Sequence, residues 1–239
     1  EQRLDNWGLV WTNTATYQGI FGRHDVTALV GMEAQKYGYT GTQVEAFNCL
    51  TYNEAYRGIV PACWDPDSGS PPGGWAGESA FLGYLGRITY NYAQKYLATF
   101  SVRRDGASNF APENRWGTFP SFSAGWRISE EPFFDISFID ELKLRGSWGQ
   151  LGNSAIPGAS YPHIFRVTTA PDYGLNGDQV VKAPVPAGFV NRDLVWETNT
   201  TLDLGFETVL FDGALDFATT YYTRDTEDFL VPIPLPDVA

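Results

Sequence analysis

Apolar and polar side chains alternate with a period of two through four successive segments between residues 81 and 150. The apolar side chains keep to even numbers, as Phe122 and Trp126 do, and the polar ones to odd numbers, as Ser123 and Arg127 do. Successive side chains of a strand point to opposite faces, so each segment predicts a strand with one apolar and one polar face. Such strands in series are typical of a membrane-spanning antiparallel β-barrel.

Over the whole chain the alternation predicts about eight strands, at residues 6–18, 24–39, 80–92, 96–105, 117–129, 141–152, 194–208 and 214–226. Their connections alternate between short turns, such as residues 93–95, and long loops, such as residues 41–79. Bacterial outer-membrane barrels have short periplasmic turns and longer outer loops. The pattern therefore predicts an oriented barrel wall in the outer membrane.

The aromatic residues fit this orientation. Five tryptophans stand at or near the long-loop ends of the predicted strands: Trp7, Trp11, Trp116, Trp148 and Trp196. Four aromatic residues stand at the short-turn ends: Tyr90, Tyr92, Tyr96 and Trp126. Tyrosine and tryptophan collect at membrane–water interfaces, so the two sets predict two aromatic girdles.

The polar faces carry charges of both signs. The charged side chains opposite the apolar ones are Arg87, Arg103, Arg127, Lys143, Arg145, Glu197, Asp203 and Glu207. A polar interior indicates a lumen that holds water or contacts a plug. The net charge of -12 leaves no basic stripe for phosphates, so nucleic acid is not an expected partner. The sequence contains no apolar run of about 18 residues, so no membrane-spanning helix is predicted.

The loop at residues 41–79 holds aromatic side chains among glycines, prolines and carboxylates. Its candidate substrate-binding residues are Tyr52, Tyr56, Trp64 and Trp75. Aromatic faces beside carboxylates suit sugar rings, although tryptophans in such loops also pack the loop on itself. Cys49 and Cys63 in the same loop are a candidate disulfide, with two free thiols as the alternative.

No catalytic constellation, metal site or cofactor site is predicted. His24 and His163 are far apart in the sequence, and neither a nucleophile elbow nor a phosphate-binding loop occurs. The segment of residues 65–69 resembles the start of a calcium loop, but it has proline second and lacks the later glutamate. The chain is therefore not expected to be an enzyme.

Four segments resemble one known family in order and spacing. They are residues 103–120 (RRDGASNFAPENRWGTFP), 123–131 (SAGWRISEE), 142–153 (LKLRGSWGQLGN) and 191–198 (NRDLVWET). The chain is similar here to the SusC/RagA family of TonB-dependent outer-membrane transporters of Bacteroidota. Asn109 stands where that family usually carries a basic residue, and Ala111 where it usually carries glycine.

The resemblance implies that residues 1–239 are part of the barrel domain, about eight strands of a barrel of about 22. The plug, the TonB box and the remaining strands are then expected outside this sequence. It further implies active import of a nutrient across the bacterial outer membrane, with an oligosaccharide as the leading ligand and a peptide as another. The implied partners are a SusD-like surface lipoprotein, the TonB–ExbB–ExbD machinery and outer-membrane lipid.

Two alternatives remain open on the residues. Eight strands could close into a complete passive barrel that serves as an adhesin or a small pore. The long loops and aromatic residues could instead belong to a secreted carbohydrate-binding β-sandwich.

Overall fold

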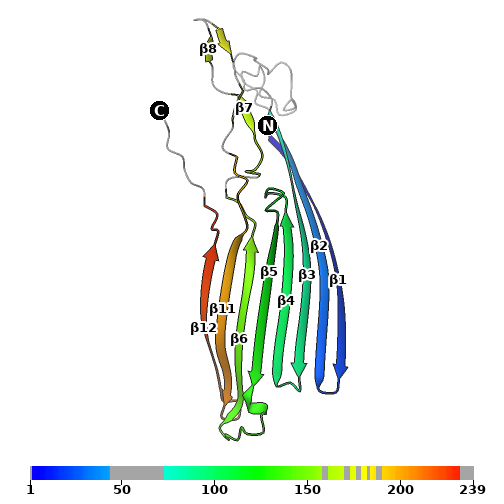
Figure 1. Cartoon of the computed structure of the whole chain (residues 1–239), viewed down its shortest axis with the longest axis vertical. Helices are drawn as coiled ribbons and strands as arrows, with labels where there is room; N and C mark the ends of the chain where they lie inside the picture. The colour runs from blue at the N-terminus through cyan, green and yellow to red at the C-terminus, as the bar shows by residue number, and fades with distance from the viewer. Residues whose placement is uncertain are drawn as a thin grey trace, which may run out of the picture. The chain divides into compact units, whose positions relative to one another are not determined.

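The computed structural model describes residues 2–43, 73–157, 161–169, 173–175, 179–181, 184–186 and 190–231. Within them one eight-stranded sheet has the order β1-β2-β3-β4-β5-β6-β11-β12 (Figure 1). Its strands are β1 (Gln2–Phe21), β2 (His24–Gln43), β3 (Gly73–Tyr92), β4 (Tyr96–Ala107), β5 (Trp116–Arg127), β6 (Ile139–Asn153), β11 (Glu197–Leu210) and β12 (Leu215–Glu227). Strands β3 to β12 of this sheet pair antiparallel, which confirms the all-β prediction.

Short elements stand in the connections. A 3₁₀ turn, η3 (Ile128–Glu130), follows β5. Two small two-stranded sheets lie between β6 and β11: β7 (Val167–Thr169) pairs with β10 (Pro184–Pro186), and β8 (Tyr173–Leu175) pairs with β9 (Gln179–Val181). No helix among the described residues is long and apolar enough to cross a membrane.

All eight predicted strands are present, but their ends differ from the prediction. Strand β1 covers residues 2–21 instead of 6–18, and β3 begins at Gly73 instead of residue 80. Strand β11 begins at Glu197, not at residue 194. At the start of β3 the strand continues where glycine and small residues interrupt the side-chain alternation, so the pattern under-reports the length of this strand.

The chain divides into two compact units, residues 1–11 with 35–80, and residues 12–34 with 81–239. In the first unit, aromatic rings lie across glycines of the strands. The Trp7 ring covers Gly38, and the Tyr39 ring covers Gly77, where an added Cβ would meet the ring. These glycines have no side chain to pack, so the neighbouring ring supplies the missing apolar contact.

In the second unit the short connections lie together at one end of the strands (Figure 1). The Ala93 amide donates to the Arg23 carbonyl at 2.7 Å, and the Arg127 amide donates to the Lys95 carbonyl at 2.8 Å. The described parts of the longer connections next to the strands, residues 108–115, 154–157 and 190–196, lie at the opposite end. The predicted alternation of short and long connections is confirmed for this unit.

The two faces of this sheet differ as the alternation predicts. One row of paired positions across five strands, all on the apolar face, is Ile88, Phe100, Phe122, Trp148 and Leu202. These side chains are 39–52% exposed. No second layer covers them within the described part of the chain, so a sandwich does not form and the exposed apolar wall fits a bilayer.

The eight-stranded sheet is open. Its order ends at β1 and β12, and these two strands do not pair among the described residues. A complete eight-stranded barrel would need that pairing, so the passive closed barrel is not what forms. Each end presents a strand edge whose backbone groups need another strand.

Charge placed on the apolar face should destabilise the wall, whereas charge on the polar face should not. We expect Phe100→Arg to lower the free energy of unfolding by about 2–4 kcal/mol because it buries a guanidinium in lipid. Ser101→Arg, one residue away and on the other face, should cost far less. Urea unfolding of the full protein in lipid vesicles measures both, and equal costs would contradict the assignment of faces.

Candidate functional site

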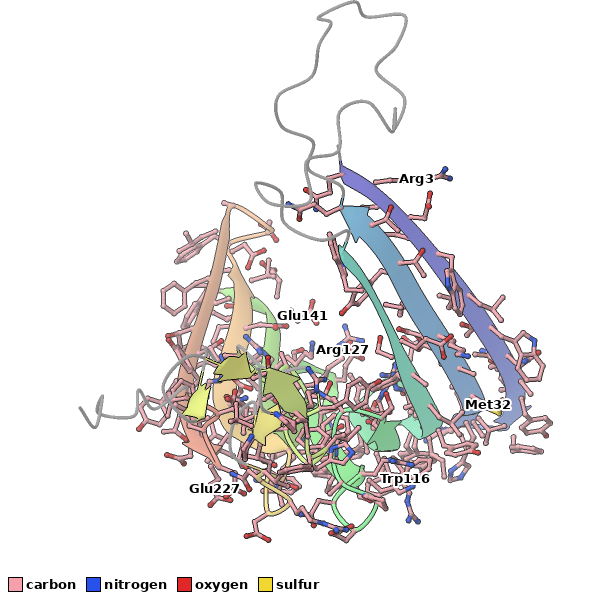
Figure 2. The ribbon with its side chains drawn as sticks, turned by 90° about the horizontal axis from the view of Figure 1, so that it is seen from above. Arg3, Met32, Trp116, Arg127, Glu141 and Glu227 are labelled. Atoms are coloured by element: carbon pink, nitrogen blue, oxygen red, sulfur yellow. The ribbon has the colours of Figure 1, made fainter. Side chains whose placement is uncertain are left out.

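The polar face of β4 to β12 forms a continuous wall of paired charges and hydroxyls. In Figure 2, Arg127 and Glu141 lie on the concave side of this part of the sheet, and Trp116 lies on the convex side. The inner position of the charges confirms the sequence prediction for the polar face. Chemically, the wall offers donors and acceptors to water or to a polar molecule.

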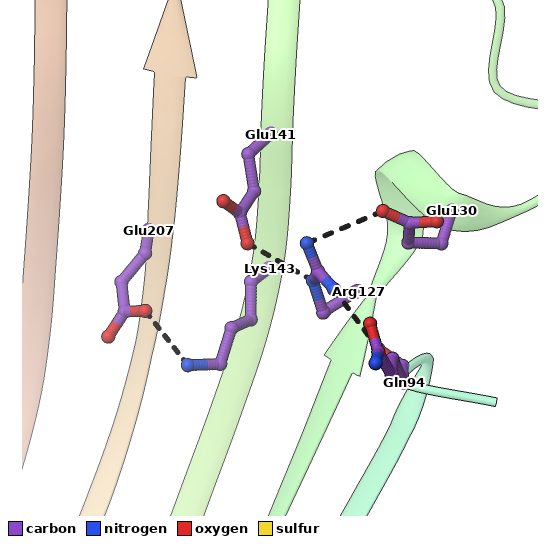
Figure 3. Close-up of polar contacts among 6 residues, drawn as sticks. All are labelled: Gln94, Arg127, Glu130, Glu141, Lys143 and Glu207. Carbon is purple, nitrogen blue, oxygen red and sulfur yellow. Dashed lines mark hydrogen bonds and ion pairs between the residues drawn. The ribbon is translucent and has the colours of Figure 1, made fainter. Parts of the chain in front are cut away.

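At the short-turn end, Arg127 organises the wall (Figure 3). Its Nε donates to Glu141 Oε1 at 3.1 Å, and its Nη1 donates to the Gln94 carbonyl at 3.4 Å. Its remaining nitrogen lies 3.4 Å from Glu130 Oε1. The guanidinium fork thus joins β5, β6, η3 and the β3–β4 turn, and fixed fork geometry suits arginine to this position.

Next along the wall, Lys143 and Arg145 share the carboxylate of Glu207. Glu207 Oε2 accepts from Lys143 Nζ at 3.0 Å (Figure 3), and Glu207 Oε1 lies 2.9 Å from Arg145 Nε. These side chains are 27–39% exposed, so each pair contributes little to stability. The pairs instead keep the wall hydrophilic while leaving no large excess of either charge.

Hydroxyl groups and a further ion pair continue the wall toward the long-loop end. Ser101 Oγ and Ser121 Oγ lie 2.6 Å apart, and Ser147 Oγ donates to Asp203 at 3.1 Å. Arg103 Nε donates to Asp105 at 2.7 Å. A surface of this mixture suits a hydrated polar solute rather than an apolar one.

The long-loop end holds the hydrophobic cluster of this unit. Phe110 is 1% exposed, and its ring centroid lies 5.3 Å from that of Trp196. Phe119 of β5 meets Trp196 edge-on at 5.5 Å, and Ala107 at the end of β4 belongs to the same cluster. Two loop residues and two strand residues thus build this core, which holds the connections against the ends of the strands.

Hydrogen bonds join three loop segments around this cluster. Trp196 Nε1 donates to the Arg115 carbonyl at 3.1 Å, which ties the segment before β11 to the β4–β5 loop. Asn109 Nδ2 donates to the Ser154 carbonyl at 2.5 Å, which ties the same loop to the segment after β6. We call residues 108–115, 154–156 and 191–196 the loop knot.

The prediction that Trp196 belongs to an interfacial girdle is wrong. Its side chain is 6% exposed inside the loop knot. Because β11 begins only at Glu197, residue 196 does not follow the alternation of the strand. Trp116 does fit the girdle: its ring is 41% exposed and stacks on Tyr84 at 6.2 Å.

The surface of the loop knot carries an ion pair. Arg192 Nε donates to Glu113 Oε1 at 3.1 Å, and Asn114 Nδ2 donates to the Arg192 carbonyl at 3.1 Å. The backbone amide of Glu113 itself, followed by Arg192, holds the pKa of the Glu113 carboxyl below its ordinary value. The two contacts clip the β4–β5 loop to the segment that leads into β11.

Three of the four predicted binding residues, Tyr52, Tyr56 and Trp64, lie outside the described residues, as does the candidate disulfide pair Cys49 and Cys63. Trp75 is described, near the start of β3, with its ring across Gly41 of β2. It packs on the neighbouring strand within its own unit and is 38% exposed. Ligand contact by the four aromatic residues and the disulfide both stay predictions.

The β-barrel family described as TonB dependent receptor-like matches residues 2–239. The chain belongs to this family. It is accordingly part of the wall of an outer-membrane β-barrel.

TonB-dependent receptor P3 of Formosa agariphila is 36% identical over 94% of this chain and 22% of its own length. TonB-dependent receptor SusC of Bacteroides thetaiotaomicron is 34% identical over 68% of this chain and 16% of its own length. The RagAB peptide transporter structure has a TM-score of 0.83 at 26% identity, over 98% of this chain and 25% of that chain. The sequence thus spans 16–25% of the length of these relatives.

The loop knot was not identified from the residues as a structural unit, although a signal for it exists. Two of the four family segments, residues 103–120 and 191–198, contribute Phe110 and Trp196 to it. The two family departures also lie here: the Asn109 side chain binds the Ser154 carbonyl, and Ala111 is 1% exposed. The family signature therefore marks packing between loops.

Removing the indole from the loop knot should release the loops without opening the wall. We expect Trp196→Ala to cost about 3–5 kcal/mol of local stability because it empties a packed site. Hydrogen exchange of amides 108–115 in the full protein should then accelerate. The matched control is Trp148→Ala on the lipid face; faster exchange of those amides in the control alone would contradict the assignment.

Acid should release the Glu113 clip. The pKa of the Glu113 carboxyl is lowered in the folded protein, so the clip stabilises the knot above the ordinary glutamate pKa and is lost as pH falls through the lowered value. We expect hydrogen exchange at residues 113 and 114 to rise, relative to intrinsic rates, in that acidic range. Glu113→Gln should show the faster exchange already at pH 7. If this variant kept the same pH dependence of exchange as the unmodified protein, the assignment would be overturned.

Proposed function

We propose that this chain is part of the barrel domain of a longer transporter that imports a nutrient across the outer membrane in a TonB-dependent manner. The observation that carries the proposal is the match of residues 2–239 to the receptor barrel family, with relatives named as TonB-dependent receptors at 36% and 34% identity. The oriented wall, with a polar inner face, supports it. No chemical conversion of the nutrient is assigned to this protein.

The whole barrel has about 22 strands in this proposal, of which the chain supplies eight. The open edges at β1 and β12 support this, because each needs a further strand. A plug fills the lumen and contacts TonB, which ExbB and ExbD energise. A SusD-like surface lipoprotein binds over the long loops.

The imported nutrient in this proposal is an oligosaccharide. The inner wall supports it through its hydroxyls and its balanced charges, which match a neutral polyhydroxylated solute. The aromatic residues Tyr52, Tyr56 and Trp64 would then contact sugar rings at the long-loop side. Trp75, which is 38% exposed although its ring lies across Gly41 of β2, would contribute to the same surface.

A peptide is the second candidate. The likeness to a structure titled as a peptide transporter, with a TM-score of 0.83, favours it. Charged side chains on the inner wall, such as Arg103 and Asp203, could pair with peptide termini and charged side chains.

Uptake by cells that carry the full protein tests the proposal. Cells would receive labelled oligosaccharides or labelled peptides, with and without an agent that collapses the proton gradient. We expect accumulation of one class that requires both the protein and the gradient. Accumulation that persists without the gradient would contradict active import, and peptide accumulation alone would select the second candidate.

Replacing residues 52–64 by a Gly-Ser linker of equal length should reduce substrate capture while barrel assembly stays intact. The reason is the loss of three aromatic faces, each worth roughly 0.5–1.5 kcal/mol in stacking. Binding of labelled substrate to intact cells measures capture, and surface labelling measures assembly. The control replaces residues 66–71, which carry no aromatic side chain. Equal capture by both variants would contradict the role of this loop.

A further inference from the structure

The lipid face of the second unit has an apolar groove near the short-turn end. It has a volume of about 790 Å³ and crosses β4, β5, β6 and β11. Small side chains, Ala124 and Gly146, form its floor, and Trp126, Leu144 and Leu204 form its sides. Leu144 and Leu204 are 42% and 52% exposed on the apolar face, so the groove opens toward lipid.

A cluster of polar groups borders this groove on the side of the short turns. We call its residues, Lys95, Tyr96, Trp126 and Glu131, the polar station. Glu131, just after η3, accepts a hydrogen bond from Tyr96 Oη at 2.5 Å and one from Trp126 Nε1 at 3.1 Å. Lys95 Nζ lies 3.5 Å from the same carboxylate. The hydrogen bond from Tyr96, followed by that from Trp126, holds the pKa of Glu131 below its ordinary value, so the carboxylate is ionised.

The aromatic rings of the polar station contact two further rings, those of Tyr92 and Phe133, and the four form a row. Tyr92 stacks on Tyr96 at 6.2 Å, Tyr96 on Trp126 at 6.5 Å, and Phe133 meets Trp126 edge-on at 6.5 Å. Phe133 is 69% exposed, so most of its ring is open to the surroundings. Rings with an apolar body and a polar end directed at one carboxylate are typical of the headgroup level of a bilayer.

The charged side chains at the short-turn end of the sheet favour one class of lipid headgroup over another. Lys95 has three donors and directs one side toward Glu131, which leaves donors for a phosphate. The short connections at this end of the strands expose carboxylates: Asp135, Asp140 and Asp212. A headgroup with net negative charge would be repelled by this rim, whereas one that adds an ammonium group to its phosphate is matched to it.

We propose that the groove and the polar station together bind one phospholipid with a zwitterionic, primary-ammonium headgroup, of the phosphatidylethanolamine type. One acyl chain lies over Ala124 and Gly146. The phosphate contacts Lys95, and the ammonium faces the acidic rim. Glu131 is a positioning residue: it holds the rings of Tyr96 and Trp126 and the ammonium of Lys95 in place.

Photo-crosslinking of the full protein tests the site. The probe is phosphatidylethanolamine with a diazirine in one acyl chain, and the crosslinked peptides are identified by mass spectrometry. We expect labels on the peptides of β5 and β6, removed by excess unlabelled phosphatidylethanolamine and not by phosphatidylglycerol. Equal competition by both lipids would overturn the headgroup assignment.

Two variants of similar size separate the groove from general contact with the bilayer. Ala124→Phe fills the groove, and labelling of β5 and β6 should fall roughly tenfold, which corresponds to about 1.4 kcal/mol of binding free energy. Leu202→Phe adds a ring to the lipid face outside the groove and should leave labelling unchanged. Persistent labelling in Ala124→Phe, with the barrel assembled as judged by its heat-dependent gel mobility, would overturn the proposal.

The positioning role has its own readout. Glu131→Gln keeps the shape of the side chain but removes the charge that orients Lys95. We expect labelling to persist at a lower level and its preference for phosphatidylethanolamine over phosphatidylglycerol to disappear. A preserved preference would overturn the role of Glu131, since a carboxylate with a purely structural role would change the amount of labelling and not the selectivity.

Discussion

Backbone amides and carbonyls have no water to bond with inside a bilayer, and this constraint shapes every part of the chain. A sheet meets it by pairing each strand with its neighbours, and only a closed sheet has no unpaired edge. The eight strands satisfy it between β2 and β11 but not at the outer edges of β1 and β12. The sheet therefore has a stable interior and two edges that only further strands can complete.

A wall one sheet thick has no interior between layers, so its side chains divide between lipid and lumen. Packing that would form a core in a soluble domain is moved to the loops. Phe110 and Trp196 show this, because these two loop residues supply half of the hydrophobic cluster, with Ala107 at the end of β4 and Phe119 near the start of β5 as its other buried members. The loop knot can thus hold the long loops in one arrangement while the wall beneath it keeps an open, polar surface.

The alternation was sufficient to predict the eight strands, their faces and the end at which the short turns lie, because one physical cause, the pleat, governs all of them. It failed where the pleat stops. Trp196 stands one residue before β11, so its burial depends on loop packing that no local pattern encodes. Strand ends were missed for a related reason: at Gly73 the backbone pairs without a side chain that reports its face.

The pair Glu130 and Glu131 shows how a short connection serves two environments. Adjacent residues in the 3₁₀ turn region point in different directions. Glu130 pairs with Arg127 on the lumen side at 3.4 Å, while Glu131 binds Trp126 on the lipid side at 3.1 Å. Arg127 and Trp126 are themselves neighbours on opposite faces of β5. Two consecutive carboxylates therefore close the strand at the membrane edge, one for the wet face and one for the apolar face, and the alternation that defines the wall continues into its turn.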